Sequence, residues 1–167
     1  MAAVFSLDLF SDPTAAAQIL SLNEKTEQFG LALSAADVSA LIQTRAEALS
    51  ANGRIEIGSA AIGRLIEAFC DSGYINQRDY PAIMHSLIEI FYYYKNETLD
   101  LISDDELIEF MKDSFENRCG GSLELLFGRD LQKLAENLRF GRKDYKNMNP
   151  ELDEPDEDED EEDPDEQ

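Results

Sequence analysis

Helical spacing of apolar residues is the feature that most restricts the fold of this chain. Between residues 34 and 138, apolar side chains recur at intervals of three and four along most of the sequence. Ser34, Ser59, Ser103 and Ser122 each stand just before one of these stretches, where a serine side chain can cap a helix. The pattern predicts a mainly α fold, a compact bundle of about five to six helices.

The expected helices begin at these caps and end at glycines or other helix breakers. Asp12 and Pro13 predict an additional first helix that reaches about residue 22. Asn76 is expected to open the longest helix, which runs to about residue 96 with Pro81 near its first turn. Gly128 lies within the last helix and predicts a local irregularity there. The longest helix should be the central one, because its apolar residues cover a wide arc: Ile83, Met84, Leu87, Ile88, Ile90, Phe91 and Tyr94.

Three short stretches have strand-like sequences. Residues 4–10 and 54–57 alternate between apolar and polar side chains, and residues 29–33 read as extended. A helix of about 17 residues rises roughly 25 Å, so the stretches on either side of the helix after Ser34 are not expected to pair. Pairing of residues 4–10 with residues 30–33 would add a minor two-stranded β element near the N-terminus.

Charge divides the chain into two parts. The formal net charge is −22, and residues 151–167 contribute 13 acidic side chains and no Lys or Arg. We expect residues 1–142 to form the helical domain and residues 143–167 to form a disordered acidic tail, because the tail has too little apolar surface to bury. An excess of negative charge disfavours direct binding to nucleic acid or to an anionic membrane. The tail suits a basic partner, nucleic-acid mimicry or loose binding of divalent cations, and simple solubilisation explains it equally well.

The start of the chain and its cysteines indicate a cytoplasmic protein. The first residues lack the basic segment and the long apolar run of a secretory signal. The stretch from residue 87 to residue 94 is the longest apolar one, and it is interrupted by Glu89 and too short to cross a bilayer. Two cysteines, Cys70 and Cys119, do not make a disulfide framework.

Residues 68–80 match part of a calcium-binding EF-hand loop. Gly73 and Asp79 stand where such a loop places its invariant glycine and its last ligand. The first two ligand positions hold Ala68 and Cys70, whose side chains carry no oxygen. A turn between two helices explains the segment better, so we expect no metal site.

His85 and Glu89 are one helical turn apart, as metal or acid–base pairs can be. His85 is the sole histidine, and no second ligand stands near it in the sequence. An ion pair or hydrogen bond on the helix surface is the simpler interpretation. Cys119 precedes a helix start that could lower its pKa, but no base accompanies it, so we expect no catalytic residue.

Three consecutive tyrosines, at positions 92 to 94, cannot all be buried on one helix. Tyr94 belongs to the apolar stripe, whereas Tyr93 lies on the opposite side. Exposed tyrosines are frequent in protein interfaces. We therefore take Tyr92 and Tyr93 as candidate partner-binding residues.

Residues 23–140 resemble an uncharacterised bacterial family of small helical proteins. Four stretches carry the resemblance: GRIEIG (residues 53–58), EAFCDSGYI (67–75), EIFYYYKNETLD (89–100) and ISDDELIEFMKDSFENRCGGSLELL (102–126). The resemblance implies a helical fold but no activity, and it assigns no functional residue or cofactor.

These observations favour a noncatalytic protein-interaction module with one protein partner and no cofactor. An enzyme whose site gathers acidic residues from distant parts of the sequence is the alternative, with Asp104, Asp105 and Glu106 as candidates at a helix start. A further alternative is an acidic mimic of nucleic acid. The sequence leaves the oligomeric state open.

Overall fold

The computed structural model describes residues 13–141, a range built from helices and their connections. Six helices have nine or more residues: α2 (Pro13–Ser21), α4 (Ala35–Ala51), α5 (Ala60–Phe69), α6 (Tyr80–Glu97), α7 (Asp104–Asn117) and α9 (Leu131–Arg139). Short turns complete the order: α3 (Asn23–Thr26), the 3-10 turn η1 (Glu27–Phe29), α8 (Leu123–Leu125) and the π turn η2 (Leu126–Asp130). The described range contains no strand, so the prediction of a mainly α bundle of five to six helices is confirmed.

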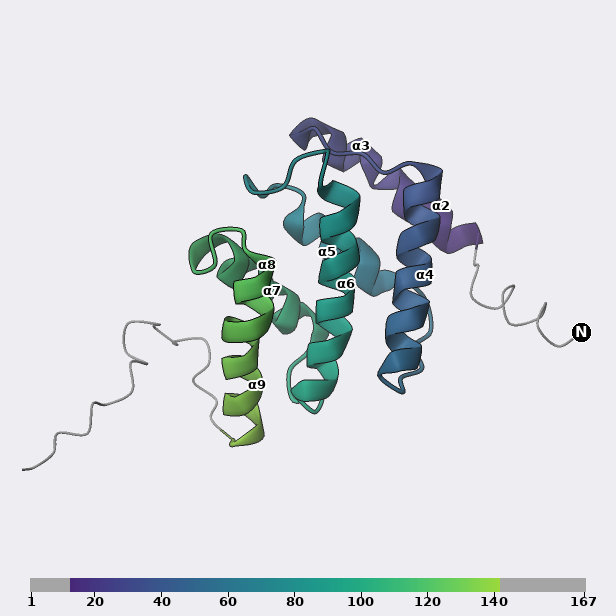
Figure 1. The fold of residues 1–167 in the computed structure, drawn as a ribbon. Coiled ribbons are helices and arrows are strands. Elements are labelled where there is room, and N and C mark those ends of the chain that lie inside the picture. Colours follow the sequence, from purple (N-terminus) through teal and green to yellow (C-terminus); the bar gives the residue numbers. More distant parts are fainter. Residues whose placement is uncertain (1–12, 142–167) are drawn as a thin grey trace, which may run out of the picture.

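Helix α6 lies at the centre of the bundle. It packs against α4, α5, α7 and α9, and Figure 1 shows it between α4 and α9 with α5 and α7 behind. Phe91 and Leu87 are completely buried, as the wide apolar arc predicts. Helix α2 crosses one end of α4 and also contacts α5, and the α3 turn continues from it over the same end of the bundle.

Serine caps fix several helix starts. Ser34 and Asp37 form a reciprocal capping box at α4, in which each side chain accepts from the backbone N–H of the other residue, at 3.0 and 2.9 Å. Ser103 and Ser122 accept from backbone N–H groups of the first turns of α7 and α8. Ser59 stands before α5 but makes no side-chain capping bond.

Helix α6 begins at Tyr80, later than its predicted start at Asn76. The backbone N–H of Asp79 bonds to the side-chain and backbone oxygens of Asn76, at 3.1 and 3.2 Å. The turn competes with helix formation because the side-chain oxygen of Asn76 accepts a backbone hydrogen bond. Pro81 does fall in the first turn, and the irregularity predicted at Gly128 is present as the π turn η2.

The predicted β pairing of residues 30–33 does not occur among the described residues, and its partner, residues 4–10, lies outside them. Two side-chain amides bond to the backbone of this stretch instead. Asn23 bonds to both the N–H and the C=O of Leu33 at 2.8 Å, and Gln77 does the same for Ala32 at 2.7 and 2.9 Å. The extended backbone is therefore already satisfied. The predicted acidic tail, residues 143–167, also lies outside the described range.

Candidate functional site

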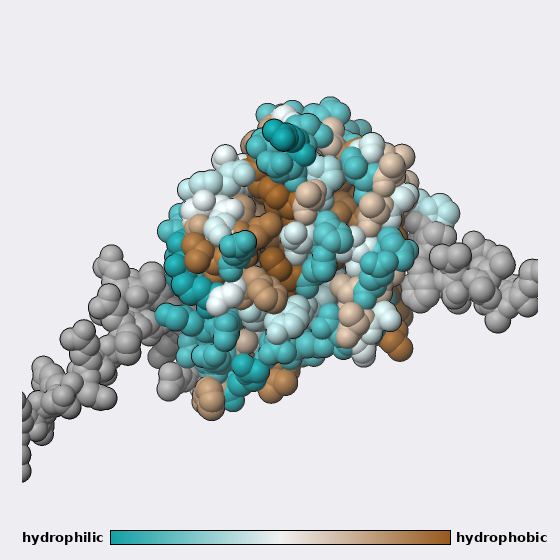
Figure 2. All heavy atoms as spheres, viewed as in Figure 1, coloured by the Kyte–Doolittle hydropathy of each residue, from teal (hydrophilic) through white to brown (hydrophobic). Residues whose placement is uncertain are grey.

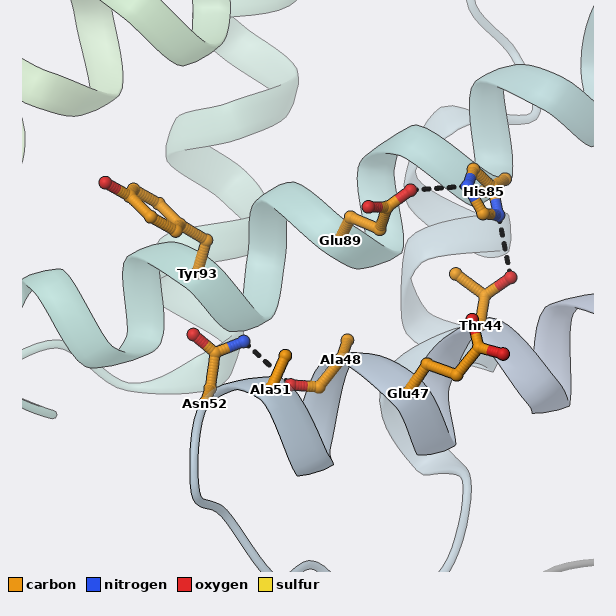
Figure 3. A pocket seen from close by; sticks show the side chains of 8 residues that line it. All are labelled: Thr44, Glu47, Ala48, Ala51, Asn52, His85, Glu89 and Tyr93. Carbon is orange, nitrogen blue, oxygen red and sulfur yellow. Dashed lines mark hydrogen bonds and ion pairs between the residues drawn. The ribbon is translucent and has the colours of Figure 1, made fainter.

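A groove lies between α4 and α6. It has a volume of about 540 Å³ and opens on the surface. Small residues of α4 form its floor, and three α6 residues spaced four apart form one wall, as Figure 3 shows. The lining residues are Thr44, Glu47, Ala48, Ala51, Asn52, His85, Glu89 and Tyr93.

Within this α4–α6 groove, three side chains form a hydrogen-bonded chain. Thr44 Oγ1 lies 2.7 Å from His85 Nδ1, and His85 Nε2 contacts Glu89 Oε1. The contact between His85 and Glu89 matches the surface ion pair or hydrogen bond expected from their spacing. Thr44 also donates its hydroxyl proton to Ala40 O at 2.8 Å. Which of Thr44 and His85 donates in their mutual contact depends on the tautomer of the imidazole.

The chain of Thr44, His85 and Glu89 resembles a nucleophilic triad in composition but not in function. A nucleophilic hydroxyl gives its proton to the imidazole, whereas Thr44 gives its own to Ala40. The groove walls are the sides of two helices, whose backbone N–H groups bond within each helix and cannot stabilise an oxyanion. Glu47 and Glu89 give the groove acceptor groups and negative charge, which suit a polar or cationic group of a ligand.

The structure separates the three tyrosines of α6. Tyr92 is completely buried, and its hydroxyl donates to Glu56 Oε1 at 2.9 Å. The prediction that Tyr92 offers its surface to a partner is therefore wrong, because Glu56 supplies a buried acceptor that only the folded chain places there. Burial raises the pKa of Tyr92. Tyr94 is buried as predicted, and Tyr93 is 40% exposed.

Tyr93 belongs to an exposed aromatic pair that sequence reasoning missed. Its ring centroid lies 5.1 Å from that of Phe127, which is also 40% exposed. The hydroxyl of buried Tyr94 donates to Phe127 O and fixes the η2 turn against α6. In the view of Figure 1, Figure 2 shows hydrophobic residues gathered in the area between α8 and α6. Spacing gave no signal for the pair, because its two members are 34 positions apart.

Neither cysteine has the environment of a nucleophile. Both are free and buried. Burial, followed by the nearby carboxylate of Asp130, raises the pKa of Cys119 to about 11. The suggestion that a helix start lowers this pKa is therefore wrong. Burial likewise raises the pKa of Cys70.

The acidic residues at the start of α7 face cations. Lys95 is buried, and its Nζ lies 2.9 Å from Asp104 Oδ1. Arg64 lies 3.9 Å from Asp104 and 3.6 Å from Asp105. The ion pairs of Asp104 and Asp105 therefore connect α7 to α5 and α6. These carboxylates do not line an open site. Over residues 13–141, no group of three or more His, Cys, Asp or Glu side chains is placed to hold a metal ion.

A second exposed surface lies in the two connections that follow α4 and α6. Residues 54–57, here called the isoleucine segment, carry Ile55 and Ile57, which are 99% and 98% exposed. Leu99 and Leu101 flank Asp100 on the neighbouring connection and are also exposed. The alternation of residues 54–57 was visible in the sequence, but it predicted a strand and not an apolar surface.

Comparison with known proteins gives one match. A family model described as "Family of unknown function (DUF6323)" matches residues 18–144. Neither a curated protein nor a solved structure matches the chain. Within the described residues, no helix combines the length and the apolar character that a membrane span requires.

Proposed function

Because the chain belongs to this family of unknown function, DUF6323, we propose its role from its own surface: it is a noncatalytic protein-interaction module. The observation that carries the proposal is the exposed aromatic pair, Tyr93 and Phe127. Aromatic side chains held in the open on a rigid scaffold are typical anchors of protein interfaces. We further propose that the module acts in the cytoplasm, since two buried free thiols suit a reducing compartment.

The aromatic pair is held in place before a partner arrives. Tyr93 projects from α6, the central helix of the bundle, and its ring also contacts that of Tyr94 at 5.0 Å between centroids. Phe127 is held by the hydrogen bond that its carbonyl accepts from Tyr94. A preorganised anchor loses little conformational entropy on binding, which favours affinity.

The α4–α6 groove adjoins the pair through Tyr93 and adds charge to this surface. Glu47 and Glu89 line it, and the whole chain has a formal net charge of −22. A partner that presents a basic side chain beside an apolar one matches both features. Electrostatic attraction of this kind speeds association and weakens with salt.

The alternatives have less support from the described residues. An enzymatic site around Asp104 and Asp105 would have to open the ion pairs with Lys95 and Arg64. A nucleic-acid mimic would depend on residues 143–167, and truncation tests it directly.

Affinity capture from the native cell, followed by mass spectrometry, tests the proposal. The baits are the full chain, a variant with Tyr93→Ser and Phe127→Ser, and a truncation after residue 142. A Phe140→Ser variant is the matched control, because Phe140 is an exposed phenylalanine at the end of α9. We expect one protein partner that is retained by the truncated chain and by the Phe140 control and is lost from the Tyr93 and Phe127 variant.

Other outcomes would contradict the proposal in distinct ways. A basic partner lost only on truncation would favour the acidic mimic. A reproducible absence of partners would favour an enzyme. A partner retained by every bait would exclude the aromatic pair as the binding surface. Thermal melts of each bait ensure that a lost partner reflects the surface and not the fold.

A further inference from the structure

The isoleucine segment forms a second surface, built from residues other than the aromatic pair. Two glycines in the left-handed region bound it, Gly53 with φ of 64° and Gly58 with φ of 82°. Arg54 anchors its start through two hydrogen bonds to the carboxylate of Asp100, at 2.7 and 3.0 Å. The surface therefore joins the connection after α4 to the connection after α6.

Side chains alternate along the isoleucine segment as they do along a strand. Arg54 and Glu56 turn toward the protein, where they pair with Asp100 and Arg45. Ile55 and Ile57 turn outward and are almost fully exposed. A segment that folded for stability alone would place its isoleucines inward and its charges outward. The reverse arrangement leaves two isoleucines in solvent and pairs both charges with the protein.

The backbone of the isoleucine segment alternates in the same way. The N–H of Arg54 donates to Leu49 O at 2.8 Å, and the C=O of Glu56 accepts from Arg45 Nη2 at 3.1 Å, so both groups face α4. Successive residues of an extended chain direct these groups to opposite edges. The N–H and C=O groups of Ile55 and Ile57 therefore face away from α4, and they make no hydrogen bond with any described residue.

Leu99, beside this surface, occupies a position that normally belongs to glycine. It follows the C-cap of α6 with φ of 55°, and it is 63% exposed. Two hydrogen bonds close the helix end, from Leu99 N–H to Asn96 O and from Asp100 N–H to Lys95 O. Glycine usually fills this site because it has no side chain to strain the left-handed backbone. Leu99 therefore combines a strained backbone with an exposed apolar side chain.

We propose that the isoleucine segment is a strand edge that binds an extended segment of a partner protein by β-augmentation. The N–H and C=O groups of Ile55 and Ile57, which have no hydrogen-bond partner among residues 13–141, would bond to the incoming backbone. The exposed isoleucines, with Leu99 and Leu101, would contact its alternate side chains. A helix cannot satisfy these groups, because its own backbone bonds internally.

Charge selects the class of partner. The charges of the isoleucine segment are neutralised in two ion pairs, so an apolar strand meets no unpaired charge there. Two copies of a chain with a formal net charge of −22 repel each other, which disfavours pairing of one edge with its own copy. The occupant is therefore a segment of a different protein, with apolar residues at alternate positions and basic residues between or beside them.

Selection from a random peptide library tests this inference on the full chain. The probe is a displayed library of ten-residue peptides, selected against the wild-type protein in low salt. We expect enriched peptides with apolar residues at every second position and a net positive charge. Binding of one synthetic peptide should weaken roughly tenfold or more in an Ile55→Ser, Ile57→Ser variant, because the apolar contacts are lost. The Tyr93→Ser, Phe127→Ser variant is the matched control and should bind normally.

Methylation of single amides in the selected peptide reports its conformation. In a bound strand, methylation of every second amide should abolish binding, whereas methylation of the intervening amides should be tolerated, since only alternate N–H groups face the edge. The inference is overturned if the enriched peptides have apolar residues three and four apart, or if no peptide is enriched. It is also overturned if the Ile55→Ser, Ile57→Ser variant binds the peptide as tightly as the wild-type protein does. Binding that depends on Tyr93 and Phe127 instead would support the proposed function while refuting the strand edge.

Discussion

Replacement of Leu99 by glycine or by alanine tests whether the end of α6 is strained. Both substitutions remove the exposed end of the leucine side chain, and they differ only in the Cβ that strains a left-handed backbone. At an ordinary helical position glycine is less stable than alanine by roughly 0.5–1 kcal/mol, because it loses more conformational entropy on folding. At Leu99, where φ is 55°, we expect the order to reverse.

The magnitude follows from two opposing effects. A residue with a Cβ loses about 1–2 kcal/mol in the left-handed conformation, which glycine adopts freely. The greater entropy of glycine in the unfolded chain offsets roughly 0.5–1 kcal/mol of this gain. Leu99→Gly should therefore be more stable than Leu99→Ala by about 0.5–1 kcal/mol.

Urea denaturation followed by circular dichroism at the helical band measures this difference. With a slope of about 1.5 kcal/mol per molar urea, the midpoint of Leu99→Gly should lie roughly 0.3–0.7 M above that of Leu99→Ala, with equal slopes. Ser39 is exposed within α4 and supplies the matched pair: Ser39→Gly should be less stable than Ser39→Ala. If alanine equals or exceeds glycine at position 99, the strain is absent, and the argument that Leu99 is kept for binding fails.

Three further predictions concern the core, a close contact and pH. Phe91→Ala should lower the free energy of unfolding by about 3–5 kcal/mol, because Phe91 is fully buried. Tyr93→Ala, on the exposed side of α6, should lower it by under about 1 kcal/mol. Equal losses in denaturant melts would mean that α6 is buried all round. Gly121→Ala should lower the free energy of unfolding by about 2–4 kcal/mol, since φ is 81° and a Cβ would lie 2.5 Å from a tyrosine ring carbon. Gly128→Ala is the control: a Cβ there has free space, so the change should be neutral or slightly stabilising. Similar melting temperatures for the two variants would refute the close contact. The Arg54 guanidinium lowers the pKa of Asp100. Their interaction therefore stabilises the fold above about pH 4, and the stabilisation is lost as the pH falls toward the lower folded-state pKa. The stability of Arg54→Gln, measured as a function of pH, should lack this part of the acid dependence. Identical curves for the variant and the wild-type protein would contradict this prediction.

Local sequence signals predicted the helices because those signals act over a few residues. Ser34 with Asp37 and Ser103 formed the caps that their spacing indicated. The wide apolar arc of α6 predicted its central place in the bundle. Phe91, which belongs to this arc, is completely buried. Those features needed no knowledge of the rest of the chain.

Some features depended on distant partners, and spacing along the sequence did not predict them. Residues 30–33 have a strand-like pattern, but Asn23 and Gln77 take the hydrogen bonds that a neighbouring strand would make. Periodicity left Tyr92 as a surface candidate, and the carboxylate of Glu56 made its burial favourable. A polar group can be buried only where a partner is supplied, and the position of that partner depends on the whole fold.

The sequence by itself determined that this chain is a helical domain with α6 at its centre, because helix periodicity and capping are local properties. Only the tertiary structure decided which side chains remain available to other molecules. It brought Phe127 beside Tyr93, and it turned Arg54 and Glu56 inward so that Ile55 and Ile57 face solvent. Exposure is the surface left over after every other segment has packed, so it cannot be computed from the neighbours of a residue in the sequence.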